Sequence, residues 1–169
     1  MSIIVYHGGT DIIDFPKADM CRPNLDFGIG FYVTVLRKQA TEWTVKLLSI
    51  PVVNKYALNR DAVLKEFRCR IFPEYNGEWL DFIVASRIGQ KPWLPYDYIE
   101  GGVADDRVID TINLYMSDLI SRDKALERLS EHHPNTQICL LSPELYWQMF
   151  LRFHISHKNY KYISLININ

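Results

Sequence analysis

The sequence has few cysteines, and their spacing excludes two common kinds of small domain. Three cysteines occur in 169 residues, at Cys21, Cys69 and Cys139, and no two of them are spaced as Cys-x-x-Cys. An odd number of widely separated cysteines forms neither a disulfide framework nor a zinc-ligand set. We therefore expect reduced thiols, a cytoplasmic location and a site without metal.

Long hydrophobic runs are also missing. Nowhere do 18 apolar residues follow one another, and the first residues combine a short apolar run with no basic segment. We expect no membrane-spanning segment, no membrane partner and no N-terminal secretion signal. The formal net charge is −1, from 19 basic and 20 acidic residues, so the chain has no overall basic field for nucleic acid, although a local patch stays open.

Three frequent catalytic signatures are absent from the sequence. It contains no Gly-Lys-Ser/Thr phosphate loop, no Gly-x-Gly-x-x-Gly fingerprint and no nucleophile elbow. The common nucleotide and hydrolase chemistries therefore lack support. Two adjacent histidines, His132 and His133, precede a proline. Because sequence neighbours do not converge on one metal ion in a regular element, we assign them to a surface loop.

What the sequence does contain is enough apolar residues for one core. It is 48% hydrophobic and 13% aromatic, which fits a single domain over residues 1–169. Short strand patterns are mixed with helical ones without regular βαβ alternation, so we predict an α+β fold. Strands are expected over 3–6, 31–34, 51–58, 67–71, 96–100, 136–141 and 160–166, and helices over 38–48 and 76–88, after Asp106, from Ser121 to His132 and from Pro143. The strands 51–58 and 67–71 are expected to pair through residues 59–61.

Two short glycine-containing stretches stand out. Residues 22–35 place Gly28 and Gly30 directly before an aromatic and β-branched strand, where glycine allows a positive φ or close approach to a ligand. A tight turn or bulge is the alternative. The first strand ends at His7, followed by two glycines, which puts an imidazole beside accessible backbone. A purely structural hydrogen bond is the alternative for this histidine.

Together these stretches resemble the signature of a bacterial family within the ADP-ribosyltransferase superfamily. The matching blocks are Tyr6-His7-Gly8-Gly9, Asp26-Phe27-Gly28-Ile29-Gly30-Phe31-Tyr32-Val33-Thr34 and Gln39-Ala40-x-x-Trp43. Their order and spacing are similar to those of the poly(ADP-ribose) polymerase branch, which has His-Gly, Phe-Gly-x-Gly-Ile-Tyr and a later Glu on successive strands. The resemblance implies split antiparallel β-sheets with flanking helices, and NAD as a co-substrate.

The resemblance also implies roles for individual residues. The catalytic residues would be His7, Tyr32 and Gln137, and the NAD-binding residues would be Gly8, Arg22, Gly28, Gly30, Phe31 and Trp43. Gly8 would meet the nicotinamide through its backbone, and the Trp43 indole would stack on the cationic ring. The Arg22 guanidinium is our candidate for the pyrophosphate, with a surface ion pair as the alternative.

The sequence departs from the family pattern at Gln137, where the polymerases carry glutamate. Cleavage of NAD develops an oxocarbenium ion and releases neutral nicotinamide, so positioning and electrostatics supply most of the acceleration. A carboxamide can hydrogen-bond ribose hydroxyls but adds no charge. We therefore expect a single transfer rather than chain elongation. Asp105 or Asp106 could activate the acceptor, with helix capping as the alternative for both.

The sequence thus predicts a metal-independent, NAD-dependent mono-ADP-ribosyltransferase, a pentosyl-transferring enzyme whose macromolecular acceptor is a protein or a nucleic acid. By analogy with superfamily members of this size, it would be a bacterial toxin with an antitoxin partner. The alternative is a catalytically inactive module that binds a nucleotide or a protein. A third reading, an RNA 2′-phosphotransferase, requires more basic residues around the pocket than the sequence places there.

Overall fold

The computed structural model describes residues 2–16, 25–45, 50–104, 106–132 and 135–156. The fold is α+β, as predicted. Its elements in chain order are β1 (Ile3–Gly9), β2 (Phe31–Thr34), α1 (Arg37–Val45), β3 (Val52–Leu58), α2 (Arg60–Glu66), β4 (Cys69–Ile71), α3 (Gly77–Arg87), β5 (Tyr98–Gly102), α4 (Asp106–Met116), α5 (Arg122–Ser130), β6 (Thr136–Leu140), the 3₁₀ helix η2 (Pro143–Gln148) and β7 (Met149–Ser156). The strand predicted over 160–166 lies outside the described residues.

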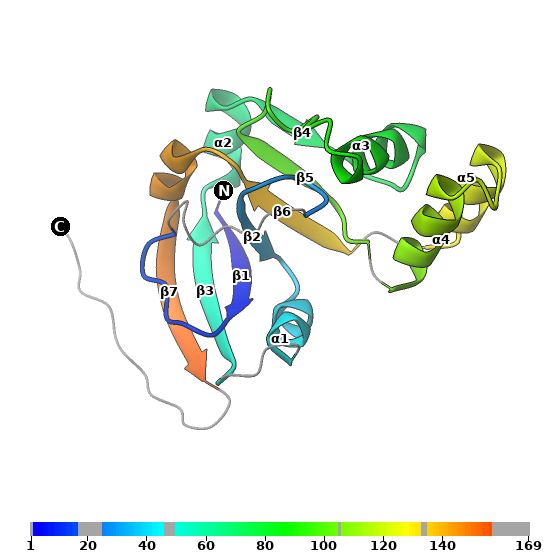
Figure 1. Cartoon of the computed structure of the whole chain (residues 1–169). Helices are drawn as coiled ribbons and strands as arrows, with labels where there is room; N and C mark the ends of the chain where they lie inside the picture. The colour runs from blue at the N-terminus through cyan, green and yellow to red at the C-terminus, as the bar shows by residue number, and fades with distance from the viewer. Residues whose placement is uncertain (1, 17–24, 46–49, 105, 133–134, 157–169) are drawn as a thin grey trace.

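The described strands form one seven-stranded sheet in the order β4-β5-β6-β2-β1-β3-β7 (Figure 1). Neighbouring strands are antiparallel except β4 and β5, which are parallel. This arrangement differs from the expected split antiparallel sheets in two respects, because the sheet is continuous and one pair is parallel. The sheet is nevertheless narrow at its centre, where β1 and β2 share the single register pair Tyr6 and Thr34.

The predicted hairpin between residues 51–58 and 67–71 is wrong. Helix α2 lies between the two strands, and β4 pairs with β5 at the opposite end of the sheet from β3. The Asn59 side chain caps α2 by accepting a hydrogen bond from the Ala62 backbone N–H at 3.3 Å. Residues 59–61 therefore begin a helix and do not form a hairpin turn. The sequence pattern fits both structures, because asparagine and aspartate favour helix N-termini as well as turns.

The helix starts predicted at Asn76 and Ser121 are confirmed by their capping bonds. The Asn76 carboxamide oxygen accepts from the Trp79 N–H at 3.0 Å, and the Ser121 hydroxyl accepts from the Lys124 N–H at 3.2 Å. Gly89 follows α3 with a φ of +83°, a conformation that suits glycine at a helix end. These elements form where the sequence predicts them because capping acts over only three or four residues.

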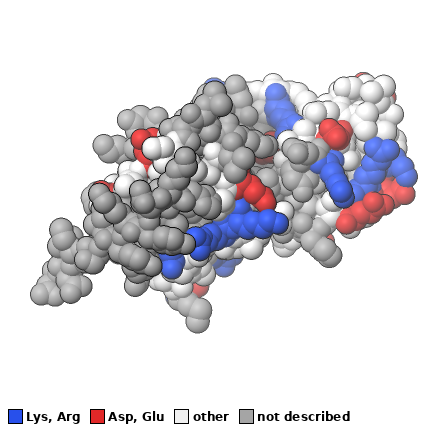
Figure 2. Space-filling model, turned by 90° about the horizontal axis from the view of Figure 1, so that it is seen from below, with Lys and Arg blue, Asp and Glu red and all other residues white. Residues whose placement is uncertain are grey.

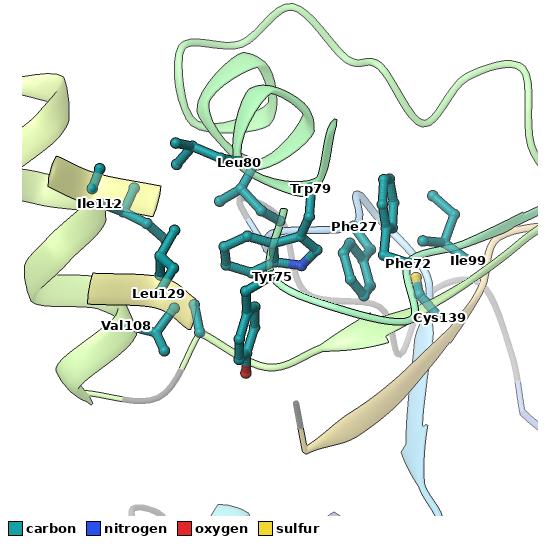
Figure 3. Packing of buried hydrophobic residues seen from close by; sticks show 13 residues of the cluster. Phe27, Phe72, Tyr75, Trp79, Leu80, Ile99, Val108, Ile112, Leu129 and Cys139 are labelled. Carbon is teal, nitrogen blue, oxygen red and sulfur yellow. The ribbon is translucent and has the colours of Figure 1, made fainter. Parts of the chain in front are cut away.

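Two apolar clusters pack against opposite faces of the sheet. Alternate strand residues divide between them, since Tyr98 belongs to one cluster and Ile99 to the other. The second cluster is built mainly from the sheet, α3, α4 and α5, and Figure 3 shows Trp79 at its centre next to Tyr75 and Leu80. Trp79 is fully buried and meets the Tyr75 ring edge to face, with centroids 4.6 Å apart. This part of the molecule is densely filled.

The described surface is mixed in charge, and none of its helices is suited to crossing a bilayer. Within the described ranges, no helix is long and apolar enough for a membrane span. On the face shown in Figure 2, basic and acidic side chains lie side by side. That face therefore presents both signs of charge. On α5, Lys124 and Glu127 form an ion pair at 2.8 Å.

Candidate functional site

The candidate site lies where β1 and β2 diverge. Beyond the pair Tyr6 and Thr34, the two strands make no further register pair, whereas β1 stays paired with β3 from Ile3 to Gly9. A cavity of about 490 Å³ opens at this divergence, within the range typical of small-molecule sites. Its walls come from β1 and the loop after it, from residues 25–32, from α1 and α3, from the connection between β5 and α4, and from β6.

The cavity brings together most of the residues that the sequence nominated. Those that line it are His7, Gly8, Gly30, Phe31, Tyr32, Trp43 and Gln137. Gly28 is not among the lining residues. Arg22 and Asp105 lie outside the described residues, and Asp106 is described only as the first residue of α4. The roles proposed for Arg22 and the two aspartates therefore stay predictions.

His7 spans the gap between the two diverging strands. Its Nδ1 lies 2.7 Å from the backbone oxygen of Tyr32, and its ring stacks on Phe31 with centroids 4.4 Å apart. Because a carbonyl oxygen only accepts, Nδ1 donates, and Nε2 is the acceptor in the neutral ring. A Cβ atom on Gly9 would lie 3.2 Å from this Nε2. The structural hydrogen bond that the sequence left as an alternative is therefore present.

Tyr32 ties the glycine loop to the strand that follows it. Its hydroxyl donates to the Gly28 carbonyl at 2.8 Å and accepts from the Phe27 N–H at 3.1 Å. Burial raises the pKa of the Tyr32 phenol far above its usual range, and the neighbouring Cys139 raises it further. Tyr32 consequently contributes a neutral wall to the cavity and cannot act as a base near neutral pH.

The two glycines of the loop have different roles. Gly28 has a φ of +94°, and a Cβ atom there would lie 2.4 Å from the Trp93 ring. The tight-turn alternative therefore explains Gly28, and its predicted NAD contact has no support from its position. A Cβ atom on Gly30 would lie 2.4 Å from the Cys139 sulfur, so Gly30 allows β2 to approach β6. Gly30 also lines the cavity.

Helix α1 is docked against β1 at Gly8. A Cβ atom on Gly8 would lie only 2.0 Å from the Ala40 carbonyl oxygen, so the helix can approach this closely only beside glycine. One turn further along α1, the half-buried Trp43 lines the cavity. Gln39, in the same sequence block, accepts a hydrogen bond from the Thr34 hydroxyl at 2.6 Å. The block Gln39-Ala40-x-x-Trp43 thus anchors α1 and presents one aromatic side chain to the cavity.

Gln137 is a buried amide in the cavity wall. It lies in β6, where it pairs with Thr34 of β2 and Gly101 of β5, and its exposed fraction is 6%. Within the described part of the chain, none of the hydrogen bonds involves its carboxamide. The fully buried side-chain atoms without a partner among the described residues are Trp79 Nε1 and Ser86 Oγ, so the Gln137 carboxamide is accessible and can hydrogen-bond a ligand in the cavity.

Sequence reasoning missed the ion pair of Asp26 and Arg87, which also lines the cavity. Nε and Nη2 of Arg87 donate to the same oxygen of Asp26, at 3.1 and 2.9 Å. Burial raises the pKa of the Asp26 carboxyl, while Arg87 acts in the opposite direction. The only local signal was an arginine in the last turn of a helix, which the helix dipole explains equally well.

Comparison with known families gives one match. A family model described as "Protein of unknown function (DUF3990)" matches residues 3–152. The chain belongs to the DUF3990 family. No curated protein and no solved structure matches this DUF3990 member. The family description assigns no activity, so the resemblance to ADP-ribosyltransferases stays a prediction.

The described lining of the cavity in this DUF3990 member offers aromatic, hydrogen-bonding and charged groups. Trp43 offers a flat face, the Gln137 carboxamide offers a donor and an acceptor, and Arg87 offers a positive charge. No group of three or more His, Cys, Asp or Glu side chains suited to a metal ion occurs within the described ranges. The described lining thus combines an indole, a carboxamide, one guanidinium and the carboxylates of Asp11 and Asp26.

Proposed function

We propose that this DUF3990 member is an NAD-dependent mono-ADP-ribosyltransferase acting on a macromolecular acceptor, a protein or a nucleic acid. The observation that carries the proposal is the convergence of His7, Tyr32, Trp43 and Gln137 on one cavity of about 490 Å³. These residues come from β1, β2, α1 and β6, so their meeting depends on the tertiary fold. The narrow junction between β1 and β2 is the feature that supports an ADP-ribosyltransferase-like sheet.

The proposed reaction breaks the bond between ribose C1′ and the nicotinamide nitrogen. The bonding electron pair leaves with nicotinamide, the acceptor nucleophile bonds to C1′, and the acceptor's proton passes to solvent or to a base on the acceptor. Trp43 would stack on the cationic ring, while His7 and Gln137 would hydrogen-bond the ribose. Since the leaving group is neutral, no acid is required. The neutral Tyr32 phenol would keep water from one side of the ring.

The test uses the purified chain with labelled NAD and a cell lysate, measuring nicotinamide release and labelled acceptors. We expect Gln137→Ala to reduce transfer by at least about tenfold, because one transition-state hydrogen bond is lost. Its thermal stability should change little, since the carboxamide has no hydrogen-bond partner within the described part of the chain. Gln90→Ala, at an exposed glutamine outside the cavity, is the matched control. Absence of both nicotinamide release and labelling in the wild type would contradict the proposal.

A catalytically inactive module is the second candidate. It is favoured by Gln137, which provides no charge, and by the pairing of Asp26 with Arg87, which neutralises one carboxylate of the cavity. Calorimetry separates the candidates: NAD binding without turnover indicates a nucleotide-binding module, and no NAD binding indicates a protein-interaction domain. Growth arrest on expression in bacteria, relieved by His7→Ala, would support the toxin and the antitoxin partner that the proposal includes.

A further inference from the structure

We propose that Arg87 binds the diphosphate of the dinucleotide and that Asp26 holds its guanidinium in position. The inference rests on the proposed function and adds a phosphate subsite to it. Both residues line the cavity, and the Arg87 side chain retains an exposed fraction of 24%. Arg87 is therefore partly buried, yet still accessible to a ligand.

Charge balance assigns the diphosphate to Arg87. The described lining residues include the carboxylates Asp11 and Asp26, and among these described residues Arg87 alone is an arginine or lysine. A diphosphate placed next to either carboxylate without a cation would be repelled by the like charge. Arg87 is therefore the lysine or arginine of the described lining whose charge attracts a diphosphate, and Asp26 shares that charge.

The ion pair with Asp26 occupies one edge of the Arg87 guanidinium. Nε and Nη2 both donate to the same Asp26 oxygen, at 3.1 and 2.9 Å, so one edge of the fork is occupied. The remaining edge is formed by Nη1 and the second proton of Nη2. Nη1 donates a long hydrogen bond to the Asn113 side-chain oxygen at 3.4 Å, and a phosphate on this edge would take the place of Asn113. Two phosphate oxygens match such an edge.

The positions of the surrounding elements agree with this subsite. Trp43 comes from α1, which packs beside β1, whereas Arg87 ends α3, which lies toward β4 and β5 (Figure 1). With the nicotinamide stacked on Trp43, the rest of an extended dinucleotide would run across β2 toward α3. Tyr32 of β2 also lines the cavity. The diphosphate would then reach Arg87.

The experiment compares ligands with and without phosphate. ADP-ribose binding is measured by calorimetry and nicotinamide binding by an NMR titration, for the wild type and three variants. Arg87→Lys keeps the charge but loses the fork, and the double variant Asp26→Asn/Arg87→Gln removes both charges without leaving a buried carboxylate unpaired. Arg122→Gln is the control, because Arg122 pairs with Asp81 at 2.7 Å and does not line the cavity.

We expect the double variant to bind ADP-ribose about 10- to 100-fold more weakly, with a smaller loss for Arg87→Lys and none for Arg122→Gln. Nicotinamide binding should stay unchanged in all of them, which also shows that the variants are folded. Equal ADP-ribose affinity in the wild type and the double variant would overturn the subsite while leaving the proposed function in place. A wild type that binds neither ADP-ribose nor NAD would instead overturn the proposed function, and the subsite with it.

Discussion

The cluster around Trp79 and the cavity beside His7 are both bordered by glycines, but only one of the two regions is filled. In the cluster, glycine makes room for an aromatic ring: a Cβ atom on Gly102 would lie 2.2 Å from the Tyr75 ring. At the end of β1, a Cβ atom on Gly9 would meet only the His7 ring. The same residue type therefore permits dense packing in one region and borders an open cavity in the other.

The difference teaches how a cavity is kept open in a domain with a well-packed core. Side chains cannot fill the junction of β1 and β2, because Gly8 and Gly9 have none and because α1 is fixed against Gly8. The His7 ring spans the gap by its bond to the Tyr32 backbone, which holds the strands at a defined separation. We infer that the Trp79 cluster contributes to stability more than the junction does, and that ligand binding depends on the junction. Three predictions test this division.

The largest effect is expected from Trp79→Ala. Removing this fully buried indole should lower the free energy of unfolding by about 3–5 kcal/mol, because a large cavity is left in a filled cluster. Denaturant unfolding measures the change. The matched variant Trp43→Ala, at a half-buried indole in the cavity wall, should lose less stability but most of its NAD affinity. Equal stability losses in the two variants would contradict the inference that the Trp79 cluster serves stability and the junction serves ligand binding.

A smaller effect is expected from Gly8→Ala. The new methyl group would meet the Ala40 carbonyl oxygen at 2.0 Å, so α1 must shift, and overpacking of this kind lowers stability by about 1–3 kcal/mol. Because Trp43 moves with α1, NAD binding should weaken as well. The control is Gly9→Ala, whose methyl group would lie 3.2 Å from the His7 ring alone. If both variants lost the same stability, the docking of α1 would not depend on Gly8.

The smallest effect of a single side chain concerns alkaline pH. Burial raises the pKa of Tyr32, Tyr56 and Tyr98 in the folded state. Above about pH 10 the unfolded chain loses these phenolic protons while the folded chain keeps them, so stability falls by about 1.4 kcal/mol per pH unit for each phenol. Below that pH the three phenols are protonated in both states and this dependence disappears.

Single variants separate a phenol in the cavity wall from a phenol in the apolar cluster on the other face of the sheet from Trp79. Above about pH 10, the free energy of unfolding decreases with pH, and Tyr32→Phe and Tyr56→Phe should each remove one phenol's share of this decrease. Denaturant unfolding between about pH 9 and pH 11 measures it. Tyr56 lies in a filled cluster, whereas Tyr32 is in the cavity wall. An unchanged slope for Tyr32→Phe, with a reduced slope for Tyr56→Phe, would mean that water in the cavity reaches the Tyr32 phenol.

Much of the local structure could be predicted from the sequence. The strands 31–34 and 136–141 and the helix after Asn76 follow from period-2 patterns and capping residues, which act over a few positions. The helix at 60–66 was missed because Asn59 suits both a turn and a helix start. The nominated His7, Tyr32, Trp43 and Gln137 do meet at one cavity, although their proposed roles are untested.

By itself, the sequence determined most of the local elements and the residue types available for a site. It also showed that the cysteines lack a disulfide or zinc spacing and that the chain has no overall basic charge. Only the tertiary structure decided that β1 parts from β2, that Gly28 lies beneath Trp93 rather than in the cavity, and that Arg87 meets Asp26. The physical reason is distance along the chain. Periodicity and capping act within a few residues, whereas Asp26 and Arg87 are separated by 61 positions and meet only when the whole sheet and its helices have packed.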